Sequence, residues 1–379
     1  MRRVRPSEKN RMMNDKVKKL GNRICFYLVA ALNILMSSVH SQELYFPDAN
    51  DHWETVEAGE AGWDRELLDE AIELTGARKS SGLLILYKGR ILAERYWPSP
   101  DTSVRYKNSL KGFDSEGRAI EDVASVQKSI TAILVGMAQE RGYLSIGDAV
   151  SDYLKEGWSQ TTRSFESKIT IRDLLSMTSG LSSDLDYETG PGKKWLYNTP
   201  AYHLLMRVVS AATNKTRESL THEWLTQPLG MINSNWIERS QSTATNFYGF
   251  ATTARDLARV GLMIQADGRW GDYTIMADGD YIEQMLTSSQ DQNPSYGYLW
   301  WLNGKDFSRG FSSEARRKEG PLITSAPKEL VAMQGALDRK LFLAPNLGLI
   351  ITRLGSSGSS EGASFNDSFW SALMRAKLP

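Results

Sequence analysis

The stretch "SVQKSITAILVGMAQERG" runs from Ser125 to Gly142 and predicts a buried helix. From Ser129 onward apolar residues occupy nearly every side of the helix, and Gly142 stands where a C-cap is expected. Ser125 and Lys128 are three positions apart, so they share one face of the first turn and can come within hydrogen-bond reach. The same pair is also compatible with an ordinary serine N-cap followed by a lysine that extends toward solvent.

Strands are predicted on both sides of this helix, far apart in the sequence. The segment "GLLILYKGRILAERYW" (82–97) reads as two strands joined by a tight turn at Lys88-Gly89. A second cluster of strands, and then a helix with one apolar face, come near the end of the chain. These later segments are "ELVAMQG" (329–335), "KLFLAPN" (340–346), "LGLIITRL" (347–354) and the helix "FNDSFWSALMRAK" (365–377).

The residues between the two strand clusters are predicted to be mostly helical, apart from a polar, unpatterned loop over 309–329. Further helices are expected over 170–177, 202–213 and 253–268. The predicted fold class is therefore α/β of the α+β type. One antiparallel sheet is formed by N- and C-terminal strands and flanked by helices, and an all-helical region is inserted in the middle. Ser125 would lie where the two parts meet, a usual position for a cleft.

Residues 1–41 predict an export signal. They hold nine Lys or Arg and two Asp or Glu, then an apolar run over 24–36, then small residues placed for cleavage before Gln42. The run is shorter than the roughly 20 residues of a membrane span, and Cys25 precedes it instead of following it, so no stable membrane anchor is expected. The chain thus divides into a signal peptide and one periplasmic or secreted domain, 42–379.

The composition of the remaining chain excludes several classes of function. Without the leader it carries 36 basic and 43 acidic residues, a net charge of −7, which disfavours nucleic acid as a partner. No H-x-H or H-E-x-x-H pattern occurs, so no metal site is predicted; a Ser-His-Asp triad is not predicted either, and no cofactor is implied. The 41% of hydrophobic residues are ample for a core. Nothing in the pattern indicates an oligomeric state.

Ser125 and Lys128 are the candidate nucleophile and base. The first turn of a helix is electropositive and the residues that follow are apolar, and both conditions lower the pKa of a lysine. The same positive potential would stabilise the oxyanion that forms when Ser125 attacks a carbonyl group.

The chain resembles the serine β-lactamase and penicillin-binding-protein superfamily, in particular its class C-like branch of family VIII carboxylesterases and 6-aminohexanoate-dimer hydrolases. The resemblance covers roughly residues 60–375. It is carried by stretches that follow one another in the order of that family: "SVQKS" (125–129), "ITIRDLLSMTSGL" (169–181), "YNTPAYHLL" (197–205), "PLGM" (228–231), "TTARDLARVGLMI" (252–264) and "GRWGD" (268–272). It implies a serine hydrolase that forms an acyl-enzyme without a cofactor.

The resemblance assigns Tyr197 a role through the family's second motif, Tyr-x-Asn. Tyr197 would move the proton between Ser125, Lys128 and the leaving group, and the neighbouring ammonium is expected to lower its pKa. The alternative is an aromatic residue of the core. Thr199 replaces the usual Asn and would offer a hydroxyl in place of an amide. Six further aromatic residues near cleft positions either shape the pocket or pack in the core: Tyr187, Trp195, Tyr248, Tyr298, Trp300 and Trp301.

The third motif of the family, Lys or His followed by Thr-Gly, is incomplete. Its counterpart is Met333-Gln334-Gly335. Gly335 would let the substrate approach the backbone, Gln334 would contact the substrate, and the N–H of Ala336 would complete an oxyanion hole with that of Ser125.

The missing Lys-Thr pair removes the groups that bind a β-lactam carboxylate, which favours a small uncharged ester or amide as substrate. Arg339 or Lys340 could replace those groups if a bend after Gly335 turned one of them into the cleft. Otherwise they are solvated charges at the start of a strand. Two other functions remain open: a β-lactamase or D-alanyl-D-alanine carboxypeptidase with the same mechanism, and a weakly catalytic member that binds a peptide or glycan.

Overall fold

The central element of the computed structural model is a six-stranded antiparallel sheet. The structure describes residues 44–48, 52–98, 101–239, 247–311, 316–359 and 364–379. In the order in which they pair, the strands are β2 (Arg90–Tyr96), β1 (Ser80–Tyr87), β14 (Leu349–Gly355), β13 (Arg339–Ala344), β12 (Val331–Gly335) and β9 (Trp301–Leu302). The predicted pairing of N- and C-terminal strands is confirmed, since β1 lies against β14. The turn at Lys88-Gly89 is also confirmed, and both residues have positive φ, as a tight hairpin turn requires.

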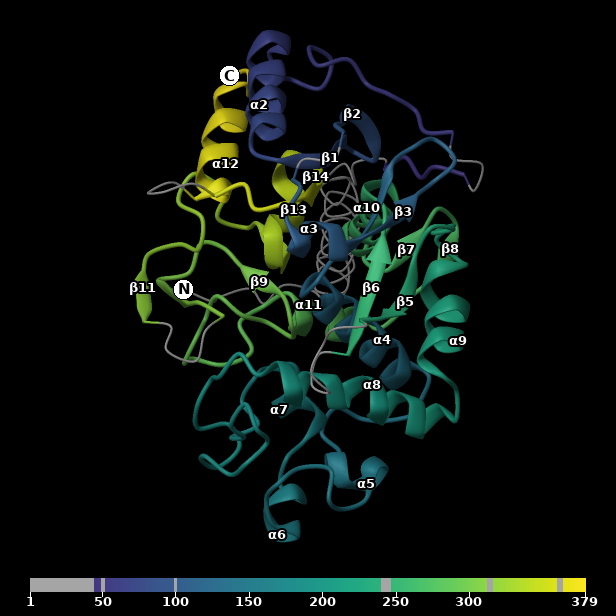
Figure 1. Cartoon of the computed structure of the whole chain (residues 1–379), viewed down its shortest axis with the longest axis vertical. Coiled ribbons are helices and arrows are strands. Elements are labelled where there is room, and N and C mark those ends of the chain that lie inside the picture. Colours follow the sequence, from purple (N-terminus) through teal and green to yellow (C-terminus); the bar gives the residue numbers. More distant parts are fainter. Residues whose placement is uncertain (1–43, 49–51, 99–100, 240–246, 312–315, 360–363) are drawn as a thin grey trace, which may run out of the picture. The chain divides into compact units, whose positions relative to one another are not determined.

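Helices cover both faces of this sheet, because its central strands are apolar on both sides. The Phe342 ring packs against Trp370 of α12 (Phe365–Arg375), and α12 lies beside α2 (Arg65–Ala77) (Figure 1). The next residues along β13, Leu341 and Leu343, face the opposite way and approach Gly261 of α10 (Ala254–Gln265). Helix α4 (Val126–Glu140) packs against β12 and β13, and every residue from Val126 to Ala138 is buried.

The predicted fold class is confirmed, and from α4 to the π-helical turn His222–Thr226 every element is helical, but the middle of the chain also contains strands that were not predicted. It holds a second antiparallel sheet with the order β3-β4-β6-β5, and a hairpin of β7 and β8. These strands are only two to five residues long, too short to show a clear period in the sequence. Their bounds are β3 (Leu110–Phe113), β4 (Ala119–Asp122), β5 (Asn235–Glu238), β6 (Tyr248–Thr252), β7 (Arg269–Trp270) and β8 (Tyr273–Thr274).

The helical part of this region packs around α4. Helix α8 (Thr199–Thr213) contacts α4, α5 and α7, and Figure 1 shows these elements away from the α2–α12 pair. The remaining helices are α3 (Val104–Ser109), α5 (Val150–Leu154), α6 (Arg163–Glu166), α7 (Ile171–Leu175), α9 (Arg217–Thr221), the π-helical turn His222–Thr226 and α11 (Gly279–Met285).

The segment 309–329 is only partly the surface loop that was predicted. Its residues Arg317–Glu319 form β11, which pairs with β10 (Phe307–Arg309), and Ile323 is fully buried. Asn303 holds the segment in place, because its side-chain amide donates hydrogen bonds to three carbonyls there.

The predicted signal peptide and its cleavage point lie outside the described residues. Within the described ranges, no helix has both the length and the apolar composition needed to cross a bilayer.

Candidate functional site

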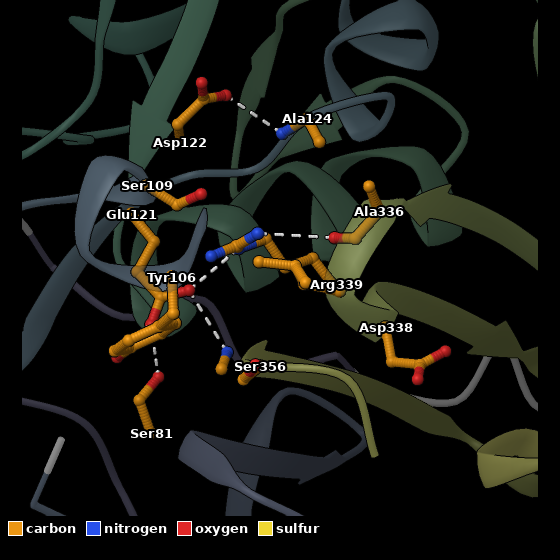
Figure 2. A network of polar contacts seen from close by, with 12 residues as sticks. Ser81, Tyr106, Ser109, Glu121, Asp122, Ala124, Ala336, Asp338, Arg339 and Ser356 are labelled. Carbon is orange, nitrogen blue, oxygen red and sulfur yellow. Dashed lines mark hydrogen bonds and ion pairs between the residues drawn. The ribbon is translucent and has the colours of Figure 1, made fainter. Parts of the chain in front are cut away.

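A strained turn between β4 and α4 positions Ser125. Ala124 has φ of +50°, a left-handed conformation that costs a non-glycine residue about 1–2 kcal/mol. The Asp122 carboxylate supports this conformation by accepting a hydrogen bond from the Ala124 N–H at 3.0 Å (Figure 2). Ser125 follows as the N-cap of α4 but makes no side-chain capping bond, so its hydroxyl is not used to hold the helix start. The ordinary N-cap interpretation of Ser125 is therefore wrong.

Lys128 lies one turn into α4 with its amine beside Ser125. Its Nζ is 3.3 Å from Ser125 Oγ, and the side chain does not extend to solvent. The amine also lies 4.9 Å from the ring centroid of Tyr197 and 4.5 Å from that of Tyr202. No ion pair among the described residues includes Lys128. The lysine is thus enclosed by one hydroxyl and two aromatic rings.

This environment makes Lys128 a base near neutral pH. Burial and, to a smaller extent, the positive charge of Arg239 lower the pKa of Lys128 to about 7. Burial penalises the charged ammonium, and no carboxylate in the described part of the chain is close enough to compensate. The direction agrees with the expectation from the sequence, although Arg239 was not part of it.

Arg239 is held next to this base by an ion pair. Its guanidinium donates to both carboxylate oxygens of Asp122, at 2.6 and 2.8 Å, and to Gln127 Oε1 at 3.4 Å. Asp122 therefore supports two parts of the site, the Ala124 turn and the arginine. Sequence reasoning did not identify Arg239, which lies 111 positions after Lys128 and belongs to none of the three motifs.

Tyr197 is positioned behind Ser125 by stacked aromatic rings. Its ring is 5.9 Å from that of Trp301 at an interplanar angle of 27°, with Tyr296 and Trp195 at its edges. Burial raises the pKa of Tyr197, and a polar contact with the Ser125 side chain lowers it by less. The expectation that this pKa is lowered is wrong, because burial is the largest cause and raises it. Tyr197 is a neutral phenol at neutral pH.

The other aromatic residues of interest do not line the pocket described below. Trp195, Tyr298, Trp300 and Trp301 are all at most 6% exposed, and Tyr187 is a surface residue at 59%. Trp195 and Trp301 reach the site indirectly, because they pack against Tyr197. Core packing is therefore the better description for Trp195, Tyr298, Trp300 and Trp301, whereas Tyr187 lies on the surface and Tyr248 is partly buried beside a second, smaller pocket.

The other two residues of the second motif, Asn198 and Thr199, have different positions. Asn198 is the N-cap of α8, accepts from the Ala201 N–H and donates to two carbonyls, those of Leu181 and Ser182. The following residue, Thr199, lines the pocket that holds Ser125 and Lys128.

Gly335 is required by the fold rather than by the substrate. A Cβ at this position would lie 2.3 Å from the carbonyl oxygen of Val123 and 3.3 Å from the N atom of Ser125. Strand β12 can therefore approach the start of α4 only with glycine here. We predicted that Gly335 makes room for the substrate, but it makes room for the chain's own backbone. The close approach of β12 to the start of α4 brings Ala336 to the pocket beside Ser125.

Met333 and Gln334 do not form a substrate subsite. Met333 is fully buried in the core. The Gln334 side chain is on the opposite face of β12, where it accepts hydrogen bonds from Lys340 Nζ at 3.0 Å and from Asn366 Nδ2 of α12 at 3.2 Å. The predicted contact of Gln334 with substrate is therefore not supported by its orientation.

Arg339 and Lys340 are buried, so their interpretation as solvated charges is wrong. Lys340 turns toward α12 with Gln334, whereas Arg339 lines the pocket. Figure 2 shows Arg339 between Ala336 and Glu121: Nη1 donates to the Ala336 carbonyl at 3.3 Å and Nε to Glu121 Oε2 at 2.8 Å. Both side chains of this ion pair are at most 1% exposed.

Glu121 is itself held by three further donors. Its oxygens accept hydrogen bonds from the hydroxyls of Ser81 and Tyr106 and from the Gly355 N–H. Ser81 and Gly355 come from the six-stranded sheet and Tyr106 from α3, so the carboxylate ties the two parts of the domain together (Figure 2). A buried carboxylate with this many hydrogen-bond partners fixes Arg339 in place.

These residues meet in one pocket of about 810 Å³. Ser125 and Lys128 lie in it with Thr199, Ala336 and Arg339, and its opposite wall comes from α3 and β3. Among the described residues that line the pocket, six are Lys or Arg and one, Asp122, is acidic. The lining is therefore strongly cationic, which the missing Lys-Thr motif did not lead us to expect.

Comparisons with known proteins agree with this architecture. The family model described as Beta-lactamase matches residues 65–355, most of the chain. The protein belongs to the beta-lactamase family. Ser125, Lys128 and Tyr197 all fall within the matched residues, so the family covers the whole candidate site.

Individual relatives are distant. An uncharacterized protein of Alkalihalophilus pseudofirmus is 23% identical over 322 residues, which cover 78% of this chain and 88% of that protein. Among solved structures, a Bacillus anthracis protein named as a 6-aminohexanoate-dimer hydrolase aligns with a TM-score of 0.62 at 16% identity, covering 89% of this chain and 91% of that one. EstCE1, a hydrolase with promiscuous acyltransferase activity, gives a TM-score of 0.59 at 15% identity, covering 82% and 99%. At these identities the structural likeness shows the fold, and the family supports a hydrolase.

Proposed function

We propose that the protein is an exported serine hydrolase that cleaves a small ester or amide through an acyl-enzyme on Ser125. One observation carries the proposal: the Lys128 amine lies 3.3 Å from Ser125 Oγ, buried, with a pKa of about 7. A serine is a weak nucleophile unless a base takes its proton, and a lysine at this pKa is substantially neutral at neutral pH.

The acylation step follows from the positions of these groups. Ser125 Oγ attacks the carbonyl carbon while its proton passes to Lys128 Nζ, which forms a tetrahedral oxyanion. The backbone N–H groups of Ser125 and Ala336 are the candidate donors to that oxyanion, because Gly335 brings the two backbones together.

The second half of the reaction returns the enzyme to its starting state. When the tetrahedral species collapses, the bond to the leaving group breaks and that group takes a proton from the Lys128 ammonium, directly or through the Tyr197 phenol. Water then attacks the acyl-enzyme with Lys128 again as base, and the acid is released. Tyr197 acts as a neutral donor and acceptor in this scheme, since burial keeps its pKa high.

A comparison of four substrates tests the proposal. Purified protein would be assayed with p-nitrophenyl acetate, p-nitrophenyl butyrate, nitrocefin and a short amino-acid p-nitroanilide. We expect turnover of the esters or the anilide that exceeds turnover of nitrocefin. Faster hydrolysis of nitrocefin would replace this function with that of a β-lactamase, and no turnover of any substrate would favour a binding role.

Export is proposed from the residues of the leader alone. A basic segment, an apolar run and small residues before Gln42 support it. N-terminal sequencing of the protein recovered from the periplasm or the medium should find a start within a residue or two of Gln42. Protein found in the cytosol with an intact start at Met1 or Met13 would contradict export.

A further inference from the structure

We infer that the ring of Tyr202 separates the catalytic base from a second, smaller pocket and keeps solvent in that pocket away from the Lys128 amine. Tyr202 is therefore a positioning residue, since it acts on the reaction through Lys128. The inference rests on the proposed hydrolysis at Ser125. It gives the two tyrosines beside Lys128 different roles, because Tyr197 needs its hydroxyl, whereas Tyr202 needs only its ring.

Helix α8 places Tyr202 against the amine. Asn198 caps this helix, and the Tyr202 N–H donates to the Asn198 carbonyl at 3.1 Å, so the tyrosine lies one turn into α8. Helix α8 packs against α4, and the Tyr202 ring centroid is 4.5 Å from Lys128 Nζ, compared with 4.9 Å for the ring of Tyr197. Lys128 and Tyr202 are both buried. The Tyr202 ring is therefore one of the surfaces that keep the amine out of water.

The second pocket begins at the same ring. Its volume is about 110 Å³, and Tyr202 and Met206, one turn apart on α8, both line it. Arg207 and Arg217 line it too, and Arg207 is exposed, so the pocket has polar groups and lies at the surface. A cavity needs only about 10–15 Å³ and a few polar partners to hold a water molecule. Tyr202 thus contacts the catalytic amine and also lines a pocket with room for solvent.

The hydroxyl of Tyr202 does not make it a second base. Burial raises the pKa of Tyr202 to about 12, so it is a neutral phenol at neutral pH. Its ring acts on Lys128 in two opposite ways. An aromatic face attracts an ammonium, but the exclusion of water disfavours it, and burial is the largest cause of the low Lys128 pKa. Removing the ring should therefore raise the pKa of Lys128 toward its ordinary value.

The titratable and charged groups on the other sides of the amine do not change when Tyr202 is replaced. They include the hydroxyls of Ser125 and Tyr197, the Arg239–Asp122 ion pair and the Arg339–Glu121 ion pair. A substitution at Tyr202 therefore changes the access of solvent to the base and leaves these groups in place.

The rate at which a fluorophosphonate labels Ser125, measured across pH, tests the inference without depending on the substrate. The inflection of the wild type should lie near 7. In Tyr202→Leu it should move up by at least ~1 unit, so that labelling is at least ~5-fold slower at pH 7 but close to the wild-type rate at pH 10. Tyr202→Phe keeps the ring and should retain the wild-type inflection. If Tyr202→Leu does not fold, Tyr202→Met should show a smaller shift in the same direction.

The control is Met206→Ala, which enlarges the second pocket one turn further along α8 and should leave the inflection unchanged. A purely structural role of Tyr202 would slow labelling by the same factor at pH 7 and at pH 10. That result, or an equal shift in Tyr202→Phe and Tyr202→Leu, would overturn the inference but leave Ser125 as the nucleophile. No labelling of Ser125 in the wild type would instead overturn the proposed function.

Discussion

Lys128 and Arg339 are two buried cations on the wall of the same pocket, and they differ in their partners. Arg339 is paired with Glu121 at 2.8 Å, in a network that ties the two parts of the domain together. Lys128 has a serine hydroxyl and two aromatic rings around it and, among the described residues, no carboxylate. Both cations are removed from water, but only one has its charge compensated.

This difference separates two chemical roles. A guanidinium with a carboxylate partner is held in one geometry by that ion pair. A buried ammonium without such a partner loses its proton near neutral pH and can act as a base. The same sheet and helix thus provide a fixed charge and a titrating group a short distance apart.

The largest expected effect comes from removing the nucleophile. Ser125→Ala should lower turnover of p-nitrophenyl acetate to the background rate, because Lys128 then has no hydroxyl to activate. Ser129→Ala is the matched control on the same helix, since Ser129 donates to the carbonyl of Leu299 and takes no part in the site. Steady-state assays of both variants would check this, and turnover retained by Ser125→Ala would mean that another group is the nucleophile.

Removing either part of the proton relay should have the next largest effect. Lys128→Ala and Tyr197→Phe should each reduce kcat at least ~10²-fold, as expected for general-base catalysis. KM should change less, because neither side chain is expected to bind remote parts of the substrate. Tyr187→Phe, on the surface, is the control for loss of a phenol. A near-normal kcat for Tyr197→Phe would exclude Tyr197 from the relay.

The lowered pKa of Lys128 should also change how the free energy of unfolding depends on pH. The folded pKa of Lys128, about 7, lies below the ordinary value of 10.5, so between these limits the unfolded chain binds a proton that the folded chain does not. The free energy of unfolding should therefore gain up to about 1.4 kcal/mol per pH unit from this group as the pH rises from 7 to 10. Lys128→Met should remove that gain.

Urea unfolding of both proteins at pH 7 and pH 9 measures this contribution. The wild type should gain up to about 2.7 kcal/mol more than Lys128→Met between the two values. An equal change in both proteins would show that the lysine is protonated in the folded state, and Lys128 would then resemble Arg339.

The smallest effect is expected from Arg239, which adjusts the base without touching the substrate's reacting atoms. Arg239→Met removes a positive charge that lowers the pKa of Lys128. The acidic limb of the pH profile of kcat/KM should therefore move upward by roughly half a unit to one unit. Arg95→Met, at an exposed arginine on β2, should leave the profile unchanged. An unshifted profile in Arg239→Met would leave burial as the sole cause of the low pKa.

The sequence predicted the parts of this fold and site that depend on local pattern. The hairpin at Lys88-Gly89 has a turn signal between two apolar strands, and α4 has a long apolar run, so both were found. Ser125 and Lys128 could be paired because residues three apart share a helix face. The short strands β3 to β6 were missed, since four or five residues are too few for a period to stand out.

The charged groups of the site are positioned by contacts between residues that are far apart in the sequence. The sequence alone did not reveal these contacts. Glu121 and Arg339 are 218 positions apart, and the arginine reaches the pocket only because the turn after Gly335 is tight. That turn places Leu337 and Asp338 in left-handed conformations, for which the sequence offers no glycine as a signal. The Lys128 pKa similarly depends on Arg239, from the end of a different strand.

The most direct test of a serine activated by a neutral lysine is the pH dependence of labelling by a fluorophosphonate, followed by intact-mass spectrometry and peptide mapping. The wild type should gain one adduct, on Ser125, and Ser125→Ala should gain none. The labelling rate should rise with pH through an inflection near 7, the pKa of Lys128. An adduct on another residue, or an inflection near the ordinary lysine value of 10.5, would contradict this account.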